Sequence, residues 1–562
     1  MQIRNHSFAL VIFTAIILVG AGWVLRSDRV EAVGETKYDL QLLQQVVNQI
    51  RAKYVDDLNE DEAIDAAIRG MLATLDPYTE FLEKKQNDEM KMMQIQGRYG
   101  GLGIKITKQE NALVVVALFD DTPAYNVGLQ TGDRIVSIED QSTAEIDVSQ
   151  AADLLRGEPG TSVTITVHRD YDKDAIPYTI TRAIITVPVV PYAGIIEDRI
   201  GYIKLNQFTE DAGIEVERSL RKLQSQGAEG VVFDLRGNPG GLLEQAVSVA
   251  SKFLKEDRLV VYTRGRYASQ EKSYHASSSF RVETLPLVVL VDQYSASASE
   301  IVAGAIQDWD RGVVVGKPTF GKALVQQIFS MSEGTALKIT TARYYTPSGR
   351  LIQRIDRNRK MTRNQAAGTP DQQGTEEDDV GEAYKTGGGR TVYGGGGIMP
   401  DIEISLPEYP KLAAALSKQN MFVKFASQYT MKHPDIDQWS FQVTDAMVNE
   451  FRRFVQDKSF EYTTEAEQTL IRLEEILQKK DAGNDIAQTL ITLRGQLKKR
   501  QDMDYTAGRD LITTRIGAEI STKLWGSMGR YAYGVKHDPP IRAAVDILRD
   551  PGRYKQQLSK AN

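Results

Sequence analysis

Apolar residues in the middle of the chain follow two alternating patterns. Short runs such as Leu285–Val291 are wholly apolar and have the length of a buried strand, whereas stretches such as Ala212–Gln226 carry an apolar stripe at helical spacing. The expected order is strand Gly201–Asn206, helix Ala212–Gln226, strand Gly230–Leu235, helix Leu242–Leu254, strand Leu285–Val291, helix Ile301–Asp308 and strand Gly312–Gly316. Strands that alternate with helices predict an α/β core with helix-covered sheets, which we place at residues 188–405.

A second pattern precedes this core. Between residues 96 and 187 the apolar runs are short and separated by turn residues, which predicts a small β-rich domain with two helices. The expected elements are strands Ile104–Ile106, Ala112–Leu118, Thr131–Ile138 and Ser162–Arg169, and helices Ala124–Leu129 and Val148–Arg156.

Both flanks of the chain have helical patterns. Residues 36–95 contain apolar positions at helical spacing, and Leu75-Asp76-Pro77-Tyr78 ends the second expected helix. We interpret this segment as a packing or dimerising helical hairpin. Residues 406–562 are charged and helix-patterned, which predicts a separate helical module that packs or assembles.

Residues 1–35 contain the most apolar segment of the sequence. Phe8–Leu25 is an almost purely apolar run of eighteen residues, long enough to cross a bilayer as a helix. No clear small-x-small cleavage site follows it, so we favour an uncleaved membrane anchor over a signal sequence. Arg4 precedes the run and Arg26 and Arg29 follow it, so charge alone gives no firm orientation.

Residues 355–397 interrupt the α/β pattern. This stretch is dense in charge, poor in apolar residues and rich in glycine, which predicts a mobile insertion loop within the core.

Composition narrows the chemistry. The net charge of −7 offers no electrostatic case for nucleic-acid binding. The chain has no cysteine, so disulfides, thiol nucleophiles and thiolate metal sites are excluded. Its five histidines are scattered, with no H-E-x-x-H pairing, which argues against a zinc enzyme. We therefore expect a reaction without a metal or another cofactor.

The candidate chemistry lies after the strand Leu285–Val291. The segment Ser295–Glu300 places three serines at a strand-to-helix turn, where a hydroxyl is exposed at the sheet edge. Lys322 follows the next apolar strand, Gly312–Gly316. Gln326 lies on the strand Ala323–Ile328, on the same face as Lys322. A buried lysine can act as a base for a serine nucleophile, and an amide can orient it without raising its pKa.

Two other interpretations compete with this one. Serines at such a turn commonly cap a helix, with no chemical role. A Ser-His-Asp triad is disfavoured because the sequence has no G-x-S-x-G elbow and only His275 falls in the α/β core.

A glycine-rich turn follows the strand Gly230–Leu235. Arg236–Gly241 has neither the Lys-Ser/Thr ending of a P-loop nor the spacing of G-x-G-x-x-G, so phosphate binding is disfavoured. A glycine turn before a helix can instead direct N–H groups at an oxyanion.

Residues 96–187 resemble a PDZ domain. Gly101-Leu102-Gly103-Ile104 resembles its carboxylate-binding loop, and Gly132-Asp133-Arg134-Ile135 its central strand. Such a loop forms a nest of N–H groups for a carboxylate, and the sheet edge beside it accepts a peptide as an added strand. The alternative is a PDZ domain that only packs and binds no tail.

Taken together, these motifs resemble the carboxy-terminal processing proteases, also called tail-specific proteases. The resemblance covers about residues 38–405 and includes Leu75–Tyr78. It implies a multidomain α/β protein: a PDZ domain before a protease core of the ClpP/crotonase-like type, with helical segments at both ends. It also implies a serine endopeptidase whose PDZ domain captures substrate C-termini and gates the active site.

The resemblance also implies roles for individual residues. Ser297 would be the nucleophile, Lys322 the base and Gln326 the residue that orients it. The N–H of Ala298 and that of Gly240 or Gly241 would form the oxyanion hole. Asp308 matches an acidic position that supports the site, although a solvated residue at a helix end is an equal alternative.

Two features depart from the minimal family pattern. Ala323 stands where the family commonly has glycine after the lysine. The insertion at 355–397 and the C-terminal helices resemble those of longer family members.

The resulting expectation is a membrane-anchored protease of the bacterial cell envelope that faces the periplasm and cleaves proteins with free C-termini. A homo-oligomer or an adaptor protein is a further expectation, and nucleic acid is not expected as a partner. The rival is a non-catalytic PDZ scaffold that binds protein C-termini.

Overall fold

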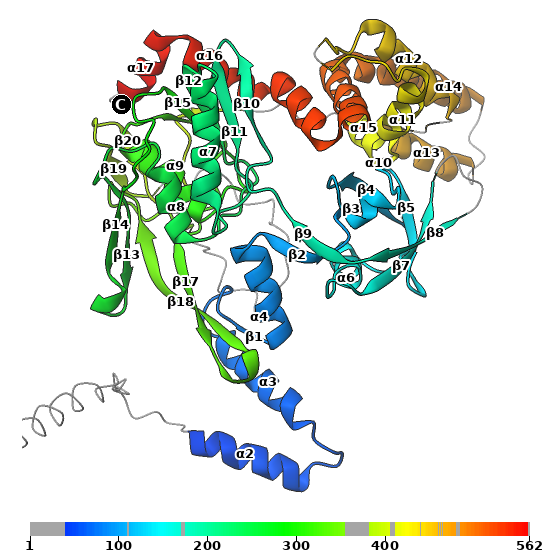
Figure 1. Ribbon diagram of the computed structural model, residues 1–562. Coiled ribbons are helices and arrows are strands. Elements are labelled where there is room, and N and C mark those ends of the chain that lie inside the picture. Colours follow the sequence, from blue (N-terminus) through cyan, green and yellow to red (C-terminus); the bar gives the residue numbers. More distant parts are fainter. Residues whose placement is uncertain are drawn as a thin grey trace, which may run out of the picture. The chain divides into compact units, whose positions relative to one another are not determined.

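The computed structural model describes residues 40–559 except 110–111, 170–174, 355–380, 405–410, 439, 459, 461, 463–464 and 479–483 (Figure 1). The chain divides into two compact units, Met1–Thr74 and Leu75–Asn562. The described part of the first unit contains the helices α2 (Leu40–Lys53) and α3 (Glu60–Leu72). The helical prediction for this segment is therefore confirmed. The side chain of Asn59 accepts a hydrogen bond from the N–H of Glu62 and so caps α3.

The second unit begins with a short strand and two helical turns. These are β1 (Glu80–Leu82), α4 (Lys84–Met90) and a π-helical turn, Lys91–Ile95. Strand β1 pairs antiparallel with the long strand β18 (Ala336–Tyr345), so the start of this unit joins a sheet of the α/β core.

The β-rich domain has the predicted character. Its main sheet has the order β3-β4-β5-β7-β8, with β6 paired to β5, and β2 and β9 form a separate pair. The strands are β2 (Arg98–Gly101), β3 (Ile104–Gln109), β4 (Ala112–Leu118), β5 (Arg134–Ile138), β6 (Gln141–Ser142), β7 (Ser162–His168), β8 (Ile176–Thr181) and β9 (Ala183–Thr186), and the helices are α5 (Pro123–Asn126) and α6 (Val148–Leu155). Alternate residues of β7 are buried, as expected for a sheet with one face on a core.

The α/β core is built on a six-stranded sheet with the order β10-β11-β12-β15-β16-β21. All neighbours are parallel except β10 and β11. The elements are β10 (Tyr192–Glu197), β11 (Ile200–Lys204), β12 (Gly230–Asp234), β15 (Leu287–Val291), β16 (Val313–Gly316) and β21 (Ile402–Glu403), with the helices α7 (Ala212–Ser225), α8 (Leu243–Ala250) and α9 (Ala298–Asp308).

The two faces of this sheet are covered by helices from distant parts of the sequence. Phe233 and Val289 pack with α7, α8 and α9 on one face, whereas Val232 and Val288 pack with α16 (Pro539–Arg549) on the other. Because both faces are covered, the central strands are wholly apolar instead of alternating. The end of the C-terminal segment is therefore a layer of the core.

A second sheet lies beside the first and carries part of the candidate site. Its order is β1-β18-β13-β14, and β17 also pairs with β18. The additional strands are β13 (Leu259–Gly265), β14 (Lys272–His275) and β17 (Leu324–Ser330), and short 3₁₀ turns lie at Ala268–Gln270 and Ser332–Gly334. Gln326 on β17 pairs with Thr340 on β18.

The described part of the predicted insertion contains a hairpin. Residues 355–380 lie outside the described residues, whereas 381–397 contain the hairpin β19 (Ala383–Lys385) and β20 (Thr391–Tyr393). Arg390 next to this hairpin forms ion pairs with Asp310 and Asp401. These contacts hold the second half of the segment against the core, which a pattern of glycine and charge did not reveal.

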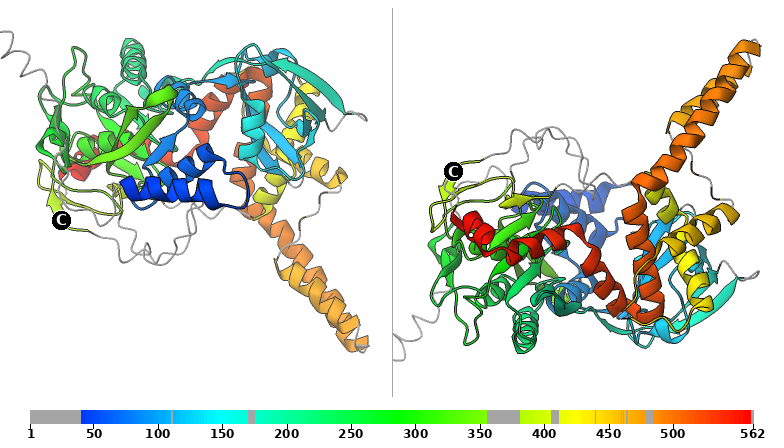
Figure 2. Two further views of the ribbon diagram at one scale, coloured as in Figure 1. Left: turned by 90° about the horizontal axis from the view of Figure 1, so that it is seen from below. Right: turned by 90° about the horizontal axis from the view of Figure 1, so that it is seen from above.

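The C-terminal segment is helical, as predicted. It contains α10 (Lys411–Lys418), α11 (Met421–Lys432), α12 (Asp445–Asp457), α13 (Glu465–Gln478), α14 (Asn484–Ala507), α15 (Arg509–His537), α16 and α17 (Pro551–Ser559). Helices α13 and α14 pack on each other as a hairpin, drawn in gold and orange in Figure 2. A kink at Trp525 and Gly526 interrupts α15.

The predicted membrane anchor, Phe8–Leu25, lies outside the described residues. Within the described ranges, none of the helices combines the length and the apolar character that a membrane span needs.

Candidate active site

Of the three serines in the turn before α9, only Ser297 keeps an accessible side chain. Ser295 is fully buried, and its hydroxyl donates to Leu235 O at 2.9 Å. Ser299 is also fully buried, and its hydroxyl donates to Asn238 O at 2.9 Å. Ser297 is half-buried at the N-cap position of α9. The outer serines are thus structural, and the middle one is the candidate nucleophile.

The backbone of Ser297 is strained. Its φ of 55° and ψ of −112° lie outside the regions that residues with a Cβ normally occupy. A strained residue between a strand and a helix is the geometry that exposes a nucleophilic serine in other hydrolases. Such strain persists only where surrounding contacts enforce it.

Lys322 lies close to the amide and the ring of two other residues. Its Nζ donates to Gln326 Oε1 at 3.2 Å and lies 4.2 Å from the ring centroid of Tyr78. The predicted pairing of Lys322 with Gln326 is thus present. The buried Nε2 of Gln326 has no hydrogen-bond partner within the described part of the chain.

The structure has no hydrogen bond between Ser297 Oγ and Lys322 Nζ, both of which are described. The pKa of Lys322 is nonetheless lowered. Burial, and secondly the charge of Lys338, lower its pKa, while the carboxylates of Asp76, Glu300 and Glu80 oppose this shift. A lowered pKa increases the fraction of neutral amine that can accept a proton.

Glu300 joins the serine turn to the lysine loop. Its fully buried carboxyl accepts hydrogen bonds from the N–H of Ser297 at 2.7 Å and of Lys322 at 3.0 Å. It also accepts from the N–H of Gly321 at 2.7 Å and from the hydroxyl of Thr319 at 2.6 Å. Burial raises the pKa of Glu300 to about 7, although the four donors favour its charged form.

Tyr344 makes a second link between the same two segments. Its buried hydroxyl lies 2.6 Å from Lys322 O and 3.1 Å from Ser297 O, so the proton is shared between the two carbonyls. Burial raises the pKa of Tyr344 well above its ordinary value, so the hydroxyl remains a donor. Sequence analysis missed Glu300 and Tyr344 as site residues, although Glu300 lies within the quoted motif.

The structure distinguishes the two candidate oxyanion glycines. Gly240 donates its N–H to Asn238 Oδ1 at 2.9 Å, so this group is already occupied. The N–H groups of Gly241 and Ala298 have no partner among the described residues. A Cβ at Gly240 would come within 2.8 Å of the Ser297 Cβ, so only glycine allows this close approach. Gly240 thus provides space beside the serine, and Gly241 provides the free donor.

Asp308 is not the solvated residue that one interpretation expected. It is buried, and its carboxylate accepts from Arg350 Nη2 at 2.7 Å and from the N–H of Ser348 at 2.9 Å. The guanidinium of Arg350 is fully buried as well. Asp308 therefore anchors the turn after β18, and it makes no hydrogen bond to Ser297 or Lys322, whose contacts are described above.

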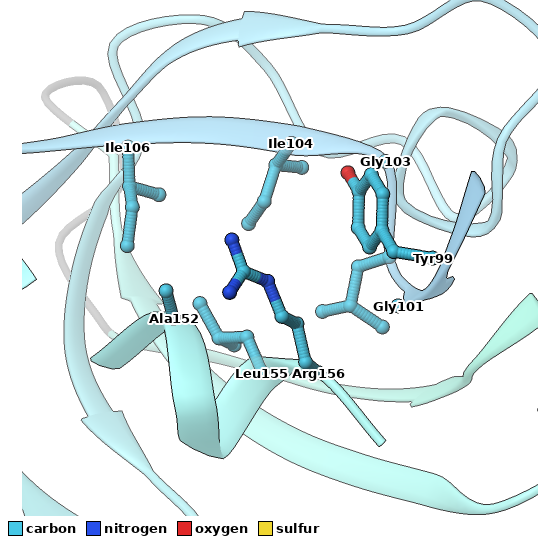
Figure 3. Close-up of a pocket in the computed structure, with 9 residues that line it drawn as sticks. Tyr99, Gly101, Gly103, Ile104, Ile106, Ala152, Leu155 and Arg156 are labelled. Carbon is cyan, nitrogen blue, oxygen red and sulfur yellow. The ribbon is translucent and has the colours of Figure 1, made fainter. Parts of the chain in front are cut away.

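The predicted carboxylate-binding loop lines a pocket of the β-rich domain (Figure 3). The lining includes Gly101, Leu102, Gly103, Ile104, Leu155 and Arg156. The carbonyls of Leu102 and Gly103 accept from the N–H groups of Ala124 and Phe119. Because a trans peptide places its C=O and N–H on opposite sides, the N–H groups of Gly103 and Ile104 point away from those partners.

Arg156 is a polar residue of this pocket that sequence analysis did not select. Its guanidinium carbon lies 5.8 Å from the ring centroid of Tyr99, and Figure 3 shows the group directed into the pocket. The pocket thus combines a cation with apolar walls from Ile104, Ile106 and Leu155. That combination suits an apolar chain end with a negative charge.

Four models of known protein families match successive regions of the chain. The model described as "Peptidase family S41" matches residues 199–360, and a PDZ domain model matches 114–169. The model "Probable PDZ-protease, C-terminal helical domain" matches 412–548, and "Activating protease CtpB N-terminal domain" matches 25–86. The fold and its site therefore define a PDZ-containing peptidase.

Individual relatives support a narrower assignment. A carboxy-terminal-processing protease of Bartonella bacilliformis is 36% identical over 352 residues, which cover 62% of this chain and 80% of the relative. A carboxyl-terminal-processing protease of Synechocystis is 38% identical over 315 residues, covering 54% and 72%. The chain belongs to the carboxy-terminal processing proteases of peptidase family S41, which are serine peptidases.

A solved structure is also similar. The photosystem II D1 C-terminal processing protease shares 25% sequence identity and a TM-score of 0.38, and the match covers 66% of this chain and 88% of that one.

The contacts of Glu300 predict a loss of activity on substitution. In Glu300→Gln an NH₂ group replaces one carboxylate oxygen and faces at least one backbone N–H group, so at least one hydrogen bond is lost. We expect kcat/KM to fall by about 10–100-fold, the effect of about 1–3 kcal/mol. Peptide hydrolysis measures this. The exposed Glu271→Gln is the control, and wild-type kcat/KM in Glu300→Gln would contradict the linking role.

The buried Asp308–Arg350 pair predicts a loss of stability. Asp308→Ala leaves the guanidinium of Arg350 buried without its counter-charge, and we expect the free energy of unfolding of the core to fall by about 3–5 kcal/mol. Urea unfolding followed by tryptophan fluorescence measures the change. Glu271→Ala, at an exposed position with an ordinary backbone conformation, should leave the unfolding transition unchanged. An unchanged transition in Asp308→Ala would refute the structural role.

Proposed function

We propose that Ser297 and Lys322 form a Ser–Lys dyad that cleaves peptide bonds near the C-termini of protein substrates. The observation that carries this proposal is the strained, accessible Ser297, joined through the buried Glu300 to the backbone of a lysine with a lowered pKa. Family membership supports the reaction class, and the geometry supports the choice of residues.

The reaction begins when the neutral Nζ of Lys322 takes the proton of the Ser297 hydroxyl as Oγ attacks the scissile carbonyl. The carbonyl oxygen becomes an oxyanion and accepts from the free N–H groups of Gly241 and Ala298. The tetrahedral intermediate collapses to an acyl-enzyme, and the ammonium of Lys322 gives its proton to the leaving amine. Water then attacks the ester as Lys322 takes its proton. The second tetrahedral intermediate collapses with cleavage of the C–Oγ bond, and Lys322 returns the proton to Ser297 Oγ as the acid product is released.

This mechanism requires a movement of the lysine side chain, because its Nζ is hydrogen-bonded to Gln326 and not to Ser297. Glu300 and Tyr344 hold the main chain of both residues in place. The ammonium, in contrast, is held by one amide oxygen and one aromatic face. We infer that Lys322 Nζ turns from Gln326 to Ser297 Oγ when substrate binds, since catalytic hydrogen bonds often tighten only in the complex.

The pocket of the PDZ domain selects the substrate in this proposal. The N–H groups of Gly103 and Ile104 and the guanidinium of Arg156 would bind the terminal carboxylate, and the apolar walls would bind the last side chain. The names of the relatives, which describe processing at carboxyl termini, support a substrate class with free C-terminal tails.

We further propose that the protein acts in the bacterial cell envelope, held in the inner membrane by Phe8–Leu25 with its active site in the periplasm. The length and apolar character of this run support the anchor. The exposed Leu40, Leu43 and Val46 of α2 support the expected association with a second copy or an adaptor protein.

The decisive experiment follows the degradation of an unfolded protein with a free apolar C-terminus. We expect the full-length wild type to cleave it, and Ser297→Ala and Lys322→Ala each to reduce the rate by about 10³-fold or more. Amidation of the substrate C-terminus should slow cleavage by wild type about tenfold, because it removes the charged group that the PDZ pocket binds.

The same experiment separates the alternatives. Cleavage that persists in both variants would place the chemistry on other residues. If wild type cleaves the amidated substrate as fast as the free one, recognition of the C-terminal tail by the pocket is refuted. Binding of the free tail without cleavage by any form would favour the non-catalytic scaffold.

A further inference from the structure

The Leu75–Tyr78 segment, which the sequence predicts to end a helix, contacts the candidate base through Tyr78. Asp76 fixes its conformation, since its Oδ1 accepts from the N–H groups of Tyr78 at 2.9 Å and Thr79 at 3.0 Å. Its Oδ2 accepts from the hydroxyl of Thr79 at 2.8 Å. The segment therefore has a defined shape that presents the ring of Tyr78 to Lys322.

Strand β18 holds this segment in place. The hydroxyl of Thr340 on β18 donates to Asp76 Oδ1 at 3.1 Å, and its N–H donates to Thr79 Oγ1 at 3.2 Å. Thr340 is also the cross-strand partner of Gln326 on β17. One position of β18 thus sets both neighbours of the ammonium, the amide of Gln326 and the ring of Tyr78.

The distance and the chemistry are those of a cation–π contact. The Nζ of Lys322 lies 4.2 Å from the ring centroid of the half-buried Tyr78, within the range of about 6 Å over which the face of an aromatic ring attracts a cation. The attraction acts on the ammonium form and is largely lost when the amine becomes neutral. The ring therefore distinguishes the two protonation states between which a base alternates.

We propose that Tyr78 is a positioning residue for the catalytic base: its ring face binds the ammonium of Lys322 and holds it against Gln326, away from Ser297. This inference rests on the proposed role of Lys322. The neutral amine is released from the ring and moves to Ser297 to accept the proton.

Other charged groups face Lys322, and their effects define what the ring adds. Lys338 favours the neutral amine, whereas Asp76, Glu80 and Glu300 favour the ammonium. Lys338 is itself paired with Glu80. Loss of the ring removes a stabilising contact of the ammonium and so lowers the pKa of Lys322. The acid limb of kcat/KM should then move to lower pH, because more of the base is neutral at a given pH.

The test compares the pH profile of kcat/KM in full-length wild type, Tyr78→Phe and Tyr78→Leu. We expect the acid limb of Tyr78→Leu to shift downward by about one pH unit, and that of Tyr78→Phe to stay in place because the ring face is retained. Tyr267→Leu replaces an exposed tyrosine of the core and should not shift the limb. The carboxyl of Glu300 is common to all variants, so the difference between them reports the ring.

A second measurement needs no catalysis. In a Ser297→Ala background, lysine labelled with ¹³C at Cε gives an NMR signal for Lys322, assigned by its loss in Lys322→Arg. Its titration midpoint should fall by about one pH unit in Tyr78→Leu and remain unchanged in Tyr78→Phe.

Two results would overturn the proposal: a Lys322 midpoint that Tyr78→Leu leaves unmoved, or an equal shift in Tyr78→Phe, which would assign the effect to the hydroxyl. The proposed Ser–Lys dyad can be refuted independently of the contact between the Tyr78 ring and Lys322. If Lys322→Ala retains activity, Lys322 is not the base, and an NMR shift in Tyr78→Leu would then show the ring–ammonium contact without a catalytic role.

Discussion

The site depends on one buried carboxyl group. Glu300 accepts four hydrogen bonds, two of them from the backbone N–H groups of Ser297 and Lys322. Burying a carboxyl is costly unless donors surround it, so the turn before α9 and the loop before β17 must adopt conformations that supply those donors. Ser297, whose backbone is strained, supplies one of these donors. The same carboxyl therefore stabilises the fold locally and joins the backbones of Ser297 and Lys322, the proposed nucleophile and base.

The backbone of the site and the side chain of Lys322 are held by different contacts. The main chains of Ser297 and Lys322 are joined twice, by Glu300 and by Tyr344. The ammonium of Lys322 has only one hydrogen bond, to Gln326, and one cation–π contact, to the ring of Tyr78, among the described residues. In the proposed mechanism the Lys322 side chain moves from these contacts to Ser297. A substrate tail held in the PDZ pocket could supply the energy for that change only by binding the active arrangement more tightly.

Sequence patterns were sufficient for the fold class and for the segments that carry Ser297 and Lys322, because strand, turn and helix signals are local. The choice of Ser297 over Ser295 and Ser299 came from the family resemblance, and the burial of the outer serines supplies its physical reason. The contacts of Tyr344 and of the Tyr78 ring with Lys322 could not be predicted from the sequence. Tyr344 lies on β18 and the segment of Tyr78 is held by β18, so both contacts depend on how this strand pairs. The free N–H of Gly241 and the buried partner of Asp308 likewise depend on backbone torsions and tertiary contacts.

The most direct measurement is covalent labelling with a fluorophosphonate, which reacts with activated serines, followed by peptide mass spectrometry. The account predicts one adduct, on Ser297, which is absent in Lys322→Ala and becomes slower in Glu300→Gln. Tryptic cleavage and fragmentation distinguish Ser297 from its neighbours in the same peptide. Labelling of Ser295 or Ser299, or labelling of Ser297 that is as fast without Lys322, would contradict a dyad at this turn.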